Sequence, residues 1–527
     1  MKINTINKVS IAAILVASMV ILFRRVWLME LDTFEFDDAF MFIRYAENIL
    51  AGYGYTWNPG EPLVYGNTSI LFTYIVALNK LLFGSVLSNS WILSSATFVF
   101  AIAFLVALIQ GLFKHVQSEL LQNRLLIGAI TLPFLVMPLI LGFHISTGME
   151  TTLSLFLNTI FIFSIWSINK LEKVKFTNVI APALIGYAMF LCRPDNALVV
   201  ALFPFLFLGF NKKYKHLLYL GATLFVLIVI DSIIKYLAFG EILPLSFYAK
   251  KSGFTEGYTA KYFWNPVKYI TQIIAYLMPY IILIFVFVRK KYLGWLTSFL
   301  LPLLLTFTYY LTFDQIMGFN ARLYFPFIPY IIIPAVFLLD KTIVQYKNGD
   351  KEIWNYNSLI TKTCLLIVFL FFTVFSKYRF INKYETYAIN AGNKDAIAVQ
   401  DLDHRKYNRE VSIKKISNLL KEFPDDFVFA ATEHGFISGD NPKKVIVDLS
   451  GLHNYEIAKN GYSEKVIQDT KPDFIWMPHQ DLTVLHYNIR SGAYFQSEYE
   501  YITNVYAFGC AIRKDSKYYE ELKSLVN

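Results

Sequence analysis

The chain has 527 residues, of which 56% are hydrophobic and 17% are charged, and its formal net charge is +9. A soluble globular protein is about 45–50% apolar and about 25% charged, so this composition excludes an ordinary soluble protein and indicates a polytopic membrane protein. The lysines and arginines lie mostly in short loops between apolar runs, which is a signal of membrane topology and not of nucleic-acid binding.

Apolar runs of about 20 residues recur along the first two thirds of the chain, and each can cross the ~30 Å hydrocarbon core of a bilayer. The first run is followed by "FRRVWLMELD" and not by a small-residue cleavage site, so we expect a retained helix and no cleaved signal peptide. The predicted spans are residues 9–28, 89–113, 124–143, 150–168, 177–192, 196–211, 216–238, 267–288, 292–313, 323–339 and 360–376.

One further apolar run, "TSILFTYIVALNKLLF" at 68–83, would raise the count from eleven spans to twelve. Basic residues cluster at the N-terminus and in several later loops, and they should face the cytoplasm. Eleven spans place the N-terminal cluster and the later ones on that one side, whereas twelve place them on opposite sides. We therefore predict about eleven transmembrane helices, with residues 68–83 in or along the outer leaflet.

This topology divides the chain into two predicted domains. Residues 1–376 form a transmembrane core whose first outer loop, residues 29–88, carries juxtamembrane helices. Residues 377–527 form a soluble extracytoplasmic α/β domain, because short apolar runs such as "KKVIVDLS" and "PDFIWMP" alternate there with amphipathic stretches such as "REVSIKKISNLLKEF". The three cysteines of the chain imply no disulfide framework.

The first outer loop holds an adjacent pair of carboxylates, Asp37 and Asp38, in "DDAFMFIRYAENIL". On a helix, Asp37, Met41, Arg44 and Asn48 share one face, while apolar residues form another. An Asp pair at a helix start is a good N-cap, which is the structural interpretation. Ionisable residues at a membrane mouth are costly unless they are used, which favours a chemical role.

Similar polar residues recur in the other outer segments. Each has an ordinary structural explanation, as a cap, a Pro-Asp turn or a cation at lipid headgroups. Together they provide carboxylates and cations around one membrane-facing cavity, which suits a phosphate-bearing lipid held by basic side chains and a nearby carboxylate as general base. They are Glu150 in "STGMETT", Arg193 and Asp195 in "LCRPDNALV", Tyr248, Lys250 and Lys251 in "FYAKKSG", and Arg322 in "FNARLYFP".

The chain resembles the GT-C glycosyltransferases that use polyprenyl-phosphate sugars. The resemblance rests on these segments and on their order along the chain, together with "YGNTS", "ATEHGFISGDNPKKVIVDLSGLHN" and "KPDFIWMP". The chain is most similar to the AftB-like arabinofuranosyltransferases, along nearly its whole length. It departs from that family at "VYGNTS" and "RPDN", which leaves the donor sugar and the pocket contacts open. The resemblance implies a multi-span core with an acidic motif in the first outer loop, in a bacterial inner membrane, and a periplasmic active site and C-terminal domain.

The resemblance also implies an inverting transfer of a sugar, with D-arabinofuranose as one candidate, from a polyprenyl-phosphate donor to a glycan or glycoprotein acceptor of the cell envelope. Asp37 would be the base, and Asp38 would orient the acceptor or bind a divalent cation, although two adjacent carboxylates alone make a poor metal site. No metal-ligand set and no certain cofactor are predicted. The remaining expected roles are substrate and phosphate contacts by Arg44, Arg193, Tyr248, Lys250, Lys251 and Arg322, and shaping of the sugar pocket by Glu150 and Asp195.

Two alternatives stay open. A ligase or oligosaccharyltransferase of the same class would transfer a glycan to lipid A or a pilin, and the surfaces that choose the acceptor cannot be read from the sequence. A transporter of the lipid-linked sugar is disfavoured, because the chain shows no pair of Gly/Pro-broken helices in two halves and its polar residues gather on one side of the membrane.

Overall fold

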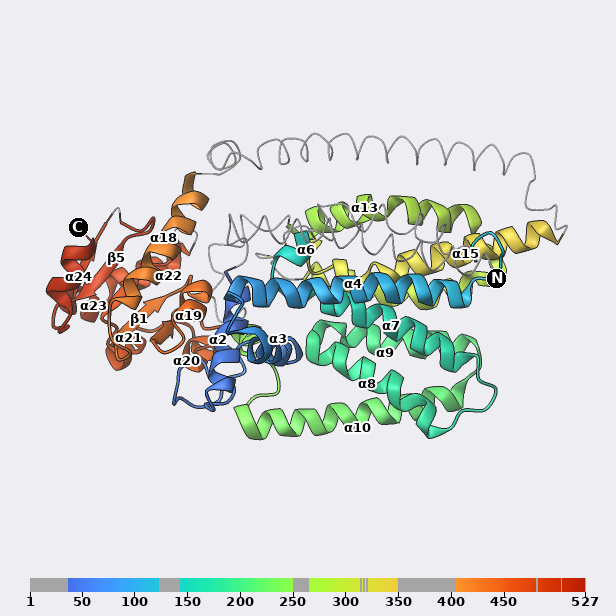
Figure 1. The fold of residues 1–527 in the computed structure, drawn as a ribbon, viewed down its shortest axis with the longest axis horizontal. Helices are drawn as coiled ribbons and strands as arrows, with labels where there is room; N and C mark the ends of the chain where they lie inside the picture. Colours follow the sequence, from blue (N-terminus) through green and yellow to red (C-terminus); the bar gives the residue numbers. More distant parts are fainter. Residues whose placement is uncertain are drawn as a thin grey trace. The chain divides into compact units, whose positions relative to one another are not determined.

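The computed structural model describes residues 37–122, 143–249, 265–312, 321–348, 404–479, 482–503 and 505–526, together with Gln315 and Gly318 (Figure 1). The chain forms two compact units. Unit 1 comprises residues 1–29, 97–229 and 264–392, and unit 2 comprises residues 30–96, 230–263 and 393–527. The predicted domain boundary at 376/377 lies outside the described residues and stays a prediction.

Unit 1 is helical in its described part, and α7, α8, α9, α13 and α15 run along a common direction (Figure 1). Helix α9 packs on α14, α13 on α15, and α7 on α8. Phe203 joins three of these helices, because its ring lies 5.0 Å from that of Phe299 and 5.3 Å from that of Tyr330. The elements are α6 (Phe143–Ser146), α7 (Thr151–Asn169), α8 (Phe176–Cys192), η2 (Pro194–Asn196), α9 (Ala197–Phe210), α13 (Asn265–Phe287), η3 (Lys290–Tyr292), α14 (Leu293–Tyr310), η5 (Phe325–Phe327) and α15 (Pro329–Lys347). Two more helices, α4 (Asn89–His115) and α10 (Tyr214–Phe239), cross a boundary between the units in the sequence.

Six described segments are long and apolar enough to cross a membrane, and the chain is a multi-pass membrane protein. They are Asn89–His115, Thr151–Asn169, Tyr214–Phe239, Asn265–Phe287, Lys290–Tyr310 and Phe325–Lys347. Each coincides with a predicted span. The spans predicted at 177–192 and 196–211 also fall on apolar helices, but these are shorter. The spans predicted at 9–28, 124–143 and 360–376 lie outside the described residues, apart from Phe143, so the count of eleven stays a prediction.

Unit 2 combines the first outer region and a later segment, residues 230–263, with a mixed α/β layer. The helices of its first part are α2 (Ala39–Leu50), α3 (Ile70–Phe83) and α11 (Leu245–Ala249). Its later helices are α18 (His404–Lys421), α19 (Gly435–Asp440), α20 (Tyr455–Asn460), α21 (Lys465–Thr470), α22 (Thr483–Ser491), α23 (Ala493–Glu498) and α24 (Tyr519–Val526). Helix α2 packs against α3 and α19, so segments distant in sequence form one packed body.

The apolar run predicted to stay out of the membrane core forms α3. The Ser69 hydroxyl accepts a hydrogen bond from the backbone N–H of Phe72 and caps the helix. The helix has 14 residues, which gives a length of about 21 Å at 1.5 Å per residue. This is less than the ~30 Å hydrocarbon core. The length agrees with a helix that does not cross, but its position in the outer leaflet stays a prediction.

The sheet of unit 2 has five strands in the order β2-β1-β3-β5-β4. Strands β2, β1 and β3 are parallel, with Val428 opposite Val445 and Phe429 opposite Phe474, and β5 and β4 continue the sheet antiparallel. The strands are β1 (Val428–Ala431), β2 (Val445–Asp448), β3 (Phe474–Trp476), β4 (Tyr499–Ile502) and β5 (Cys510–Arg513). Because β1 and β2 are parallel neighbours, the segments that follow them emerge at the same edge of the sheet, where α/β folds usually hold their ligands.

Candidate functional site

The predicted site residues fall in both units. Asp37, Asp38, Arg44 and Tyr248 belong to unit 2, whereas Glu150, Arg193, Asp195 and Arg322 belong to unit 1. Lys250 and Lys251 lie outside the described residues, so their predicted role as phosphate ligands stays a prediction. Each unit therefore holds its own cluster of candidate residues.

The acidic pair lies at the start of α2, but its carboxylates do not cap that helix. Asp38 occupies the N-cap position without a side-chain capping bond. Asp37 instead accepts hydrogen bonds from two backbone N–H groups at the start of α19, those of Gly435 at 2.9 Å and Phe436 at 2.6 Å. Free N–H groups at a helix start favour an anion, so Asp37 joins the N-terminal region to the C-terminal one.

Asp37 is buried, with only 3% of its surface exposed, which differs from the solvated position expected at a membrane mouth. Burial raises the pKa of its carboxyl, while the charge of Arg409 and the N–H of Phe436 act in the opposite direction and Glu433 adds to the rise. A carboxylate with a raised pKa binds a proton more readily, which is the property that a general base needs.

Three charged residues of the C-terminal region surround the acidic pair, and sequence reasoning assigned none of them a role. Arg409 forms a hydrogen-bonded ion pair with Glu433 through Nε at 2.6 Å and through its second terminal nitrogen. The charges of Asp37 and Asp38 act on Arg409 and also on His434, which precedes α19. Glu433 and His434 lie in "ATEHG", a motif that the sequence showed as part of the family resemblance only.

The structure gives Arg44 a different role from the predicted contact with substrate or donor phosphate. Its side chain is completely buried and its guanidinium donates to neutral oxygens within unit 2, so no N–H is left for a phosphate. Arg44 thus fastens α2 to two distant loops. Its acceptors are the backbone oxygens of Trp57 (2.7 Å), Asn441 (2.9 Å), Lys444 (2.6 Å) and Ser438 (3.5 Å), and Asn58 Oδ1 (2.8 Å).

The edge of the sheet next to the acidic pair holds two buried histidines and an aspartate. His434 Nε2 lies 2.8 Å from Asp448 Oδ1. Asp448 Oδ2 accepts the backbone N–H of His453 at 2.6 Å. The ring of His453 stacks on Trp57 at 3.9 Å with an interplanar angle of 4°.

The cluster of unit 1 is centred on Arg193, which follows α8. Its guanidinium binds Asp195 with both Nε (3.1 Å) and a terminal nitrogen (2.5 Å), and the other terminal nitrogen lies 3.7 Å from Glu150. The Tyr310 hydroxyl donates to the same Asp195 carboxylate at 2.5 Å. The bidentate pair fixes the direction of Arg193. Its buried Nη1 has no hydrogen-bond partner among the described residues, so it keeps a donor for an anion.

Two remaining predicted residues have different surroundings. Arg322 is buried in the turn before η5, in the same unit as Arg193. The Tyr248 hydroxyl donates to Glu241 at 2.7 Å, and the amine of Lys459 lies 4.0 Å from the centre of its ring. Tyr248 is thus part of a local polar cluster, and a contact with substrate stays a prediction.

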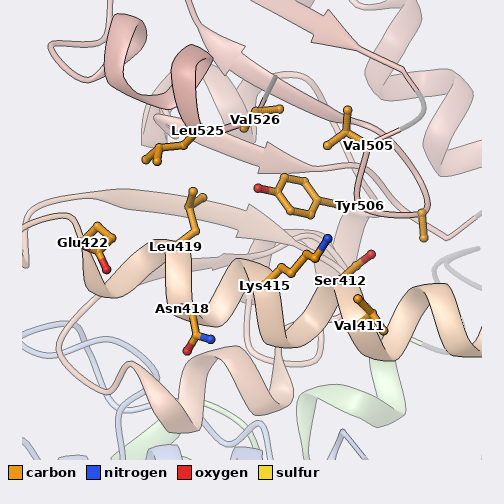
Figure 2. Close-up of a pocket in the computed structure, with 11 residues that line it drawn as sticks. Val411, Ser412, Lys415, Asn418, Leu419, Glu422, Val505, Tyr506, Leu525 and Val526 are labelled. Carbon is orange, nitrogen blue, oxygen red and sulfur yellow. The ribbon is translucent and has the colours of Figure 1, made fainter. Parts of the chain in front are cut away.

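A separate cavity of about 910 Å³ lies between α18, residues 505–507 and the end of α24 (Figure 2). The side chains of Lys415 and Tyr506 face this hollow, together with aliphatic side chains such as Leu419 and Val526. None of the predicted site residues that the structure describes lines it, so it has no assigned part in the chemistry of the acidic pair.

No protein-family model matches the chain, and no curated protein matches it. Among solved structures, the chain is similar to ArnT from Cupriavidus metallidurans bound to undecaprenyl phosphate. The TM-score is 0.48 and the sequence identity 10%, over 96% of this chain and 98% of that chain. A similarity of this strength assigns neither a family nor an activity.

Proposed function

We propose that the protein is an inverting glycosyltransferase that moves a sugar from a polyprenyl-phosphate donor to a hydroxyl group of an extracytoplasmic glycan or protein. The observation that carries the proposal is the state of Asp37, a buried carboxylate with a raised pKa, fixed by two backbone N–H groups beside a second carboxylate. The multi-span helical architecture and the family resemblance of the acidic motif support a lipid-linked donor.

In this mechanism, Asp37 takes the proton of the acceptor hydroxyl as its oxygen attacks the anomeric carbon of the donor sugar. The bond between that carbon and the phosphate oxygen breaks on the opposite side, and the polyprenyl phosphate leaves with the bonding electrons. Attack from the face opposite to the leaving group inverts the anomeric configuration. Asp38 orients the acceptor, since it lies next to the base and is only partly buried.

We propose that basic residues of the other outer segments bind the donor phosphate. Arg193 fits best among the described ones, because its position is fixed by Asp195 and its buried Nη1 has no partner among these residues. Lys250, Lys251 and Arg322 stay as further proposed phosphate ligands, and Glu150 as a proposed contact of the sugar pocket. D-arabinofuranose is proposed as the sugar on the family resemblance alone.

The test is Asp37→Asn in the purified full-length protein, with polyprenyl-phosphate arabinofuranose as donor. Loss of a general base costs about 10²–10⁴-fold in rate. An asparagine keeps one acceptor for α19 but turns its NH2 group toward the other backbone N–H, so the protein should remain folded with a loss of stability of about 1–3 kcal/mol. Asp38→Asn is the matched control and should raise KM for the acceptor more than it lowers kcat. Transfer by Asp37→Asn at close to the parent rate would refute the assignment.

The pH dependence gives a second measurement on the parent protein. The base must be ionised, and burial holds the pKa of Asp37 above its ordinary value of 3.8. The transfer rate should therefore fall about tenfold per pH unit below that raised pKa. A rate that stays constant down to pH values near the ordinary carboxyl pKa would contradict this role for Asp37.

A further inference from the structure

His434, Asp448 and His453 form a buried cluster of metal-ligating side chains at the edge of the sheet. His434 follows β1, Asp448 ends β2, and His453 lies in the loop that follows β2. Each offers one ligand atom, and the three atoms lie within 4.8 Å of one another. The proposed transfer reaction uses none of these side chains, so their convergence calls for a separate explanation.

His434 lacks one of the hydrogen bonds that a buried imidazole normally makes. Its side chain is fully buried. Nε2 lies 2.8 Å from Asp448 Oδ1 and forms an ion-pair contact with it, whereas Nδ1 has no hydrogen-bond partner among the described residues. A buried imidazole whose polar contact is a carboxylate can share a cation with it, so the meeting point of Nε2 and Oδ1 is a suitable place for a metal ion.

His453 is held in the manner of a metal ligand. Its Nδ1 is hydrogen-bonded to the Tyr45 hydroxyl at 3.0 Å, and its ring is fixed by the stacked Trp57. A ligating histidine usually uses one nitrogen for such an orienting bond and the other for the metal. The other nitrogen, Nε2, is hydrogen-bonded to Met41 Sδ at 3.1 Å, a bond that a metal ion would replace. The two imidazole centres are 5.5 Å apart, close to the ~5 Å expected for two rings on one tetrahedral zinc ion.

The carboxylate and the local charges also fit a cation. Asp448 Oδ1 accepts bonds from the backbone N–H and the hydroxyl of Ser450, which fix its orientation, as hydrogen bonds commonly do for ligating carboxylates. The Asp448 carboxylate also brings a negative charge to the ligand atoms, which suits a cation. Two nitrogens and one carboxylate oxygen match the preference of Zn²⁺, whereas Mg²⁺ and Ca²⁺ prefer sites made of oxygen alone.

We propose that His434 Nε2, Asp448 Oδ1 and His453 Nε2 bind one Zn²⁺ ion, with the Met41 thioether or a water molecule in the fourth position. Ligand atoms at about 2.0 Å from a tetrahedral zinc lie about 3.3 Å apart. The pair at 2.8 Å is already near this spacing. The ring of His453 must therefore close by up to about 1.5 Å on binding.

An ion at this position would also fix the turn whose N–H groups hold Asp37 of the acidic motif. His434 immediately precedes Gly435 and Phe436, whose N–H groups hold Asp37. A zinc ion on His434 would fix this turn to the ends of both strands and so fix the direction of the two N–H groups. The proposal goes beyond glycosyl transfer and does not depend on it, since the ion could bind whatever reaction Asp37 performs.

The experiment measures metal content of the full-length protein, purified through a tag without histidine and without chelator, by mass spectrometry of zinc, manganese and magnesium. We expect about one zinc per chain in the parent and in Asp37→Asn, and loss of at least about tenfold in His434→Ala and His453→Ala. His486→Ala is the matched control, because His486 lies in α22 outside the cluster and its Nδ1 contacts the carbonyl oxygen of Pro478. It should keep the zinc.

A measurement on the parent alone covers the case in which the histidine variants do not fold. Removal of zinc with a chelator should lower Tm, and added Zn²⁺ should restore it, while Mg²⁺ should not. A parent that contains no zinc and gains no thermal stability from added Zn²⁺ would refute the proposal and leave a buried His434–Asp448 ion pair. Retention of zinc by His434→Ala, or binding of manganese or magnesium in place of zinc, would also refute it. Loss of transfer in Asp37→Asn without loss of zinc would leave the two proposals independent.

Discussion

The role of Arg44 gives the most direct test of the architecture, because the sequence and the structure disagree about it. Arg44→Met removes every bond of the guanidinium and leaves the buried carbonyl oxygen of Lys444 without its donor, whereas the oxygens of Trp57 and Asn441 keep the Asn48 amide and the Lys444 backbone N–H. Each buried acceptor left unpaired costs about 1–3 kcal/mol. The other hydrogen bonds lost add about 1 kcal/mol each, and the loss of a buried charge that contacts only neutral oxygens offsets part of this, so we expect a net destabilisation of about 2–3 kcal/mol. For a unit of this size, that corresponds to a fall in Tm of about 5–10 °C.

The assay is thermal unfolding of the purified protein, with binding of the polyprenyl-phosphate donor measured in parallel below Tm. Arg490→Met is the matched control, since Arg490 is exposed and lies 4.7 Å from the centre of the Tyr501 ring. This exposed contact contributes about 0.5–1 kcal/mol. Arg44→Lys should give an intermediate Tm, because lysine keeps the charge but offers three donors. An Arg44→Met protein that has the parent Tm but no longer binds donor would refute the structural role and restore the phosphate contact.

Two further predictions concern the contact between α2 and α19 and the core of the sheet. In Gly435→Ala, the new Cβ would lie 2.2 Å from the Asp37 carbonyl oxygen, so α19 must move and its N–H groups must leave the carboxylate; transfer should fall at least about tenfold. Gly439→Ala is the control, because its new Cβ crowds Phe40 on the same pair of helices; it should lower Tm but keep most of the activity. Equal losses of activity in both variants would contradict the role of the two α19 N–H groups that hold Asp37. Burial raises the pKa of the Cys510 thiol to about 12, so its alkylation at pH 8, in a chain with the other two cysteines replaced by serine, should be about 10³-fold slower than that of a free cysteine. Rapid alkylation of the folded protein would show that β5 is not buried as described.

The long apolar helices could be predicted because their signal is local. A run such as residues 216–238 has the length and composition of a membrane span whatever the rest of the chain does, and α10 lies there. The same holds for the strands, since "DDFVFAAT" contains β1 and "KKVIVDLS" contains β2. Strand order could not be predicted, because the pairing of β3 with β5 joins segments more than 30 residues apart through backbone bonds that no side-chain pattern specifies.

In the candidate site, too, contacts between residues distant in sequence could not be predicted from local patterns. The adjacent carboxylates singled out the segment before α2, and the helical pattern placed Arg44 on a helix, whereas Asp37 lies in the turn before that helix. A basic residue on an amphipathic juxtamembrane helix suggests a phosphate or headgroup contact, yet the partners of Arg44 include loop residues about 400 positions later in the chain. His434 left a usable signal, because polar residues that directly follow a buried parallel strand often reach a ligand site. That signal becomes informative only once β1 is known to be parallel to its neighbour.

The acidic motif and the C-terminal region act as one chemical group. Asp37 by itself would be an ordinary carboxylate, but burial raises its pKa while Arg409 and the N–H of Phe436 oppose the rise. His434 opposes the rise as well, and all three opposing groups come from the C-terminal region, as does Glu433, which adds to the rise. Removing any one of these groups changes the pKa of Asp37. A lower pKa makes the carboxylate a weaker base, and a higher pKa leaves more of it protonated and unable to act as a base. We therefore regard the C-terminal region as the part of the protein that sets the basicity of Asp37, and a change in "ATEHG" should alter the pH dependence of transfer even when no residue of the first outer loop is changed.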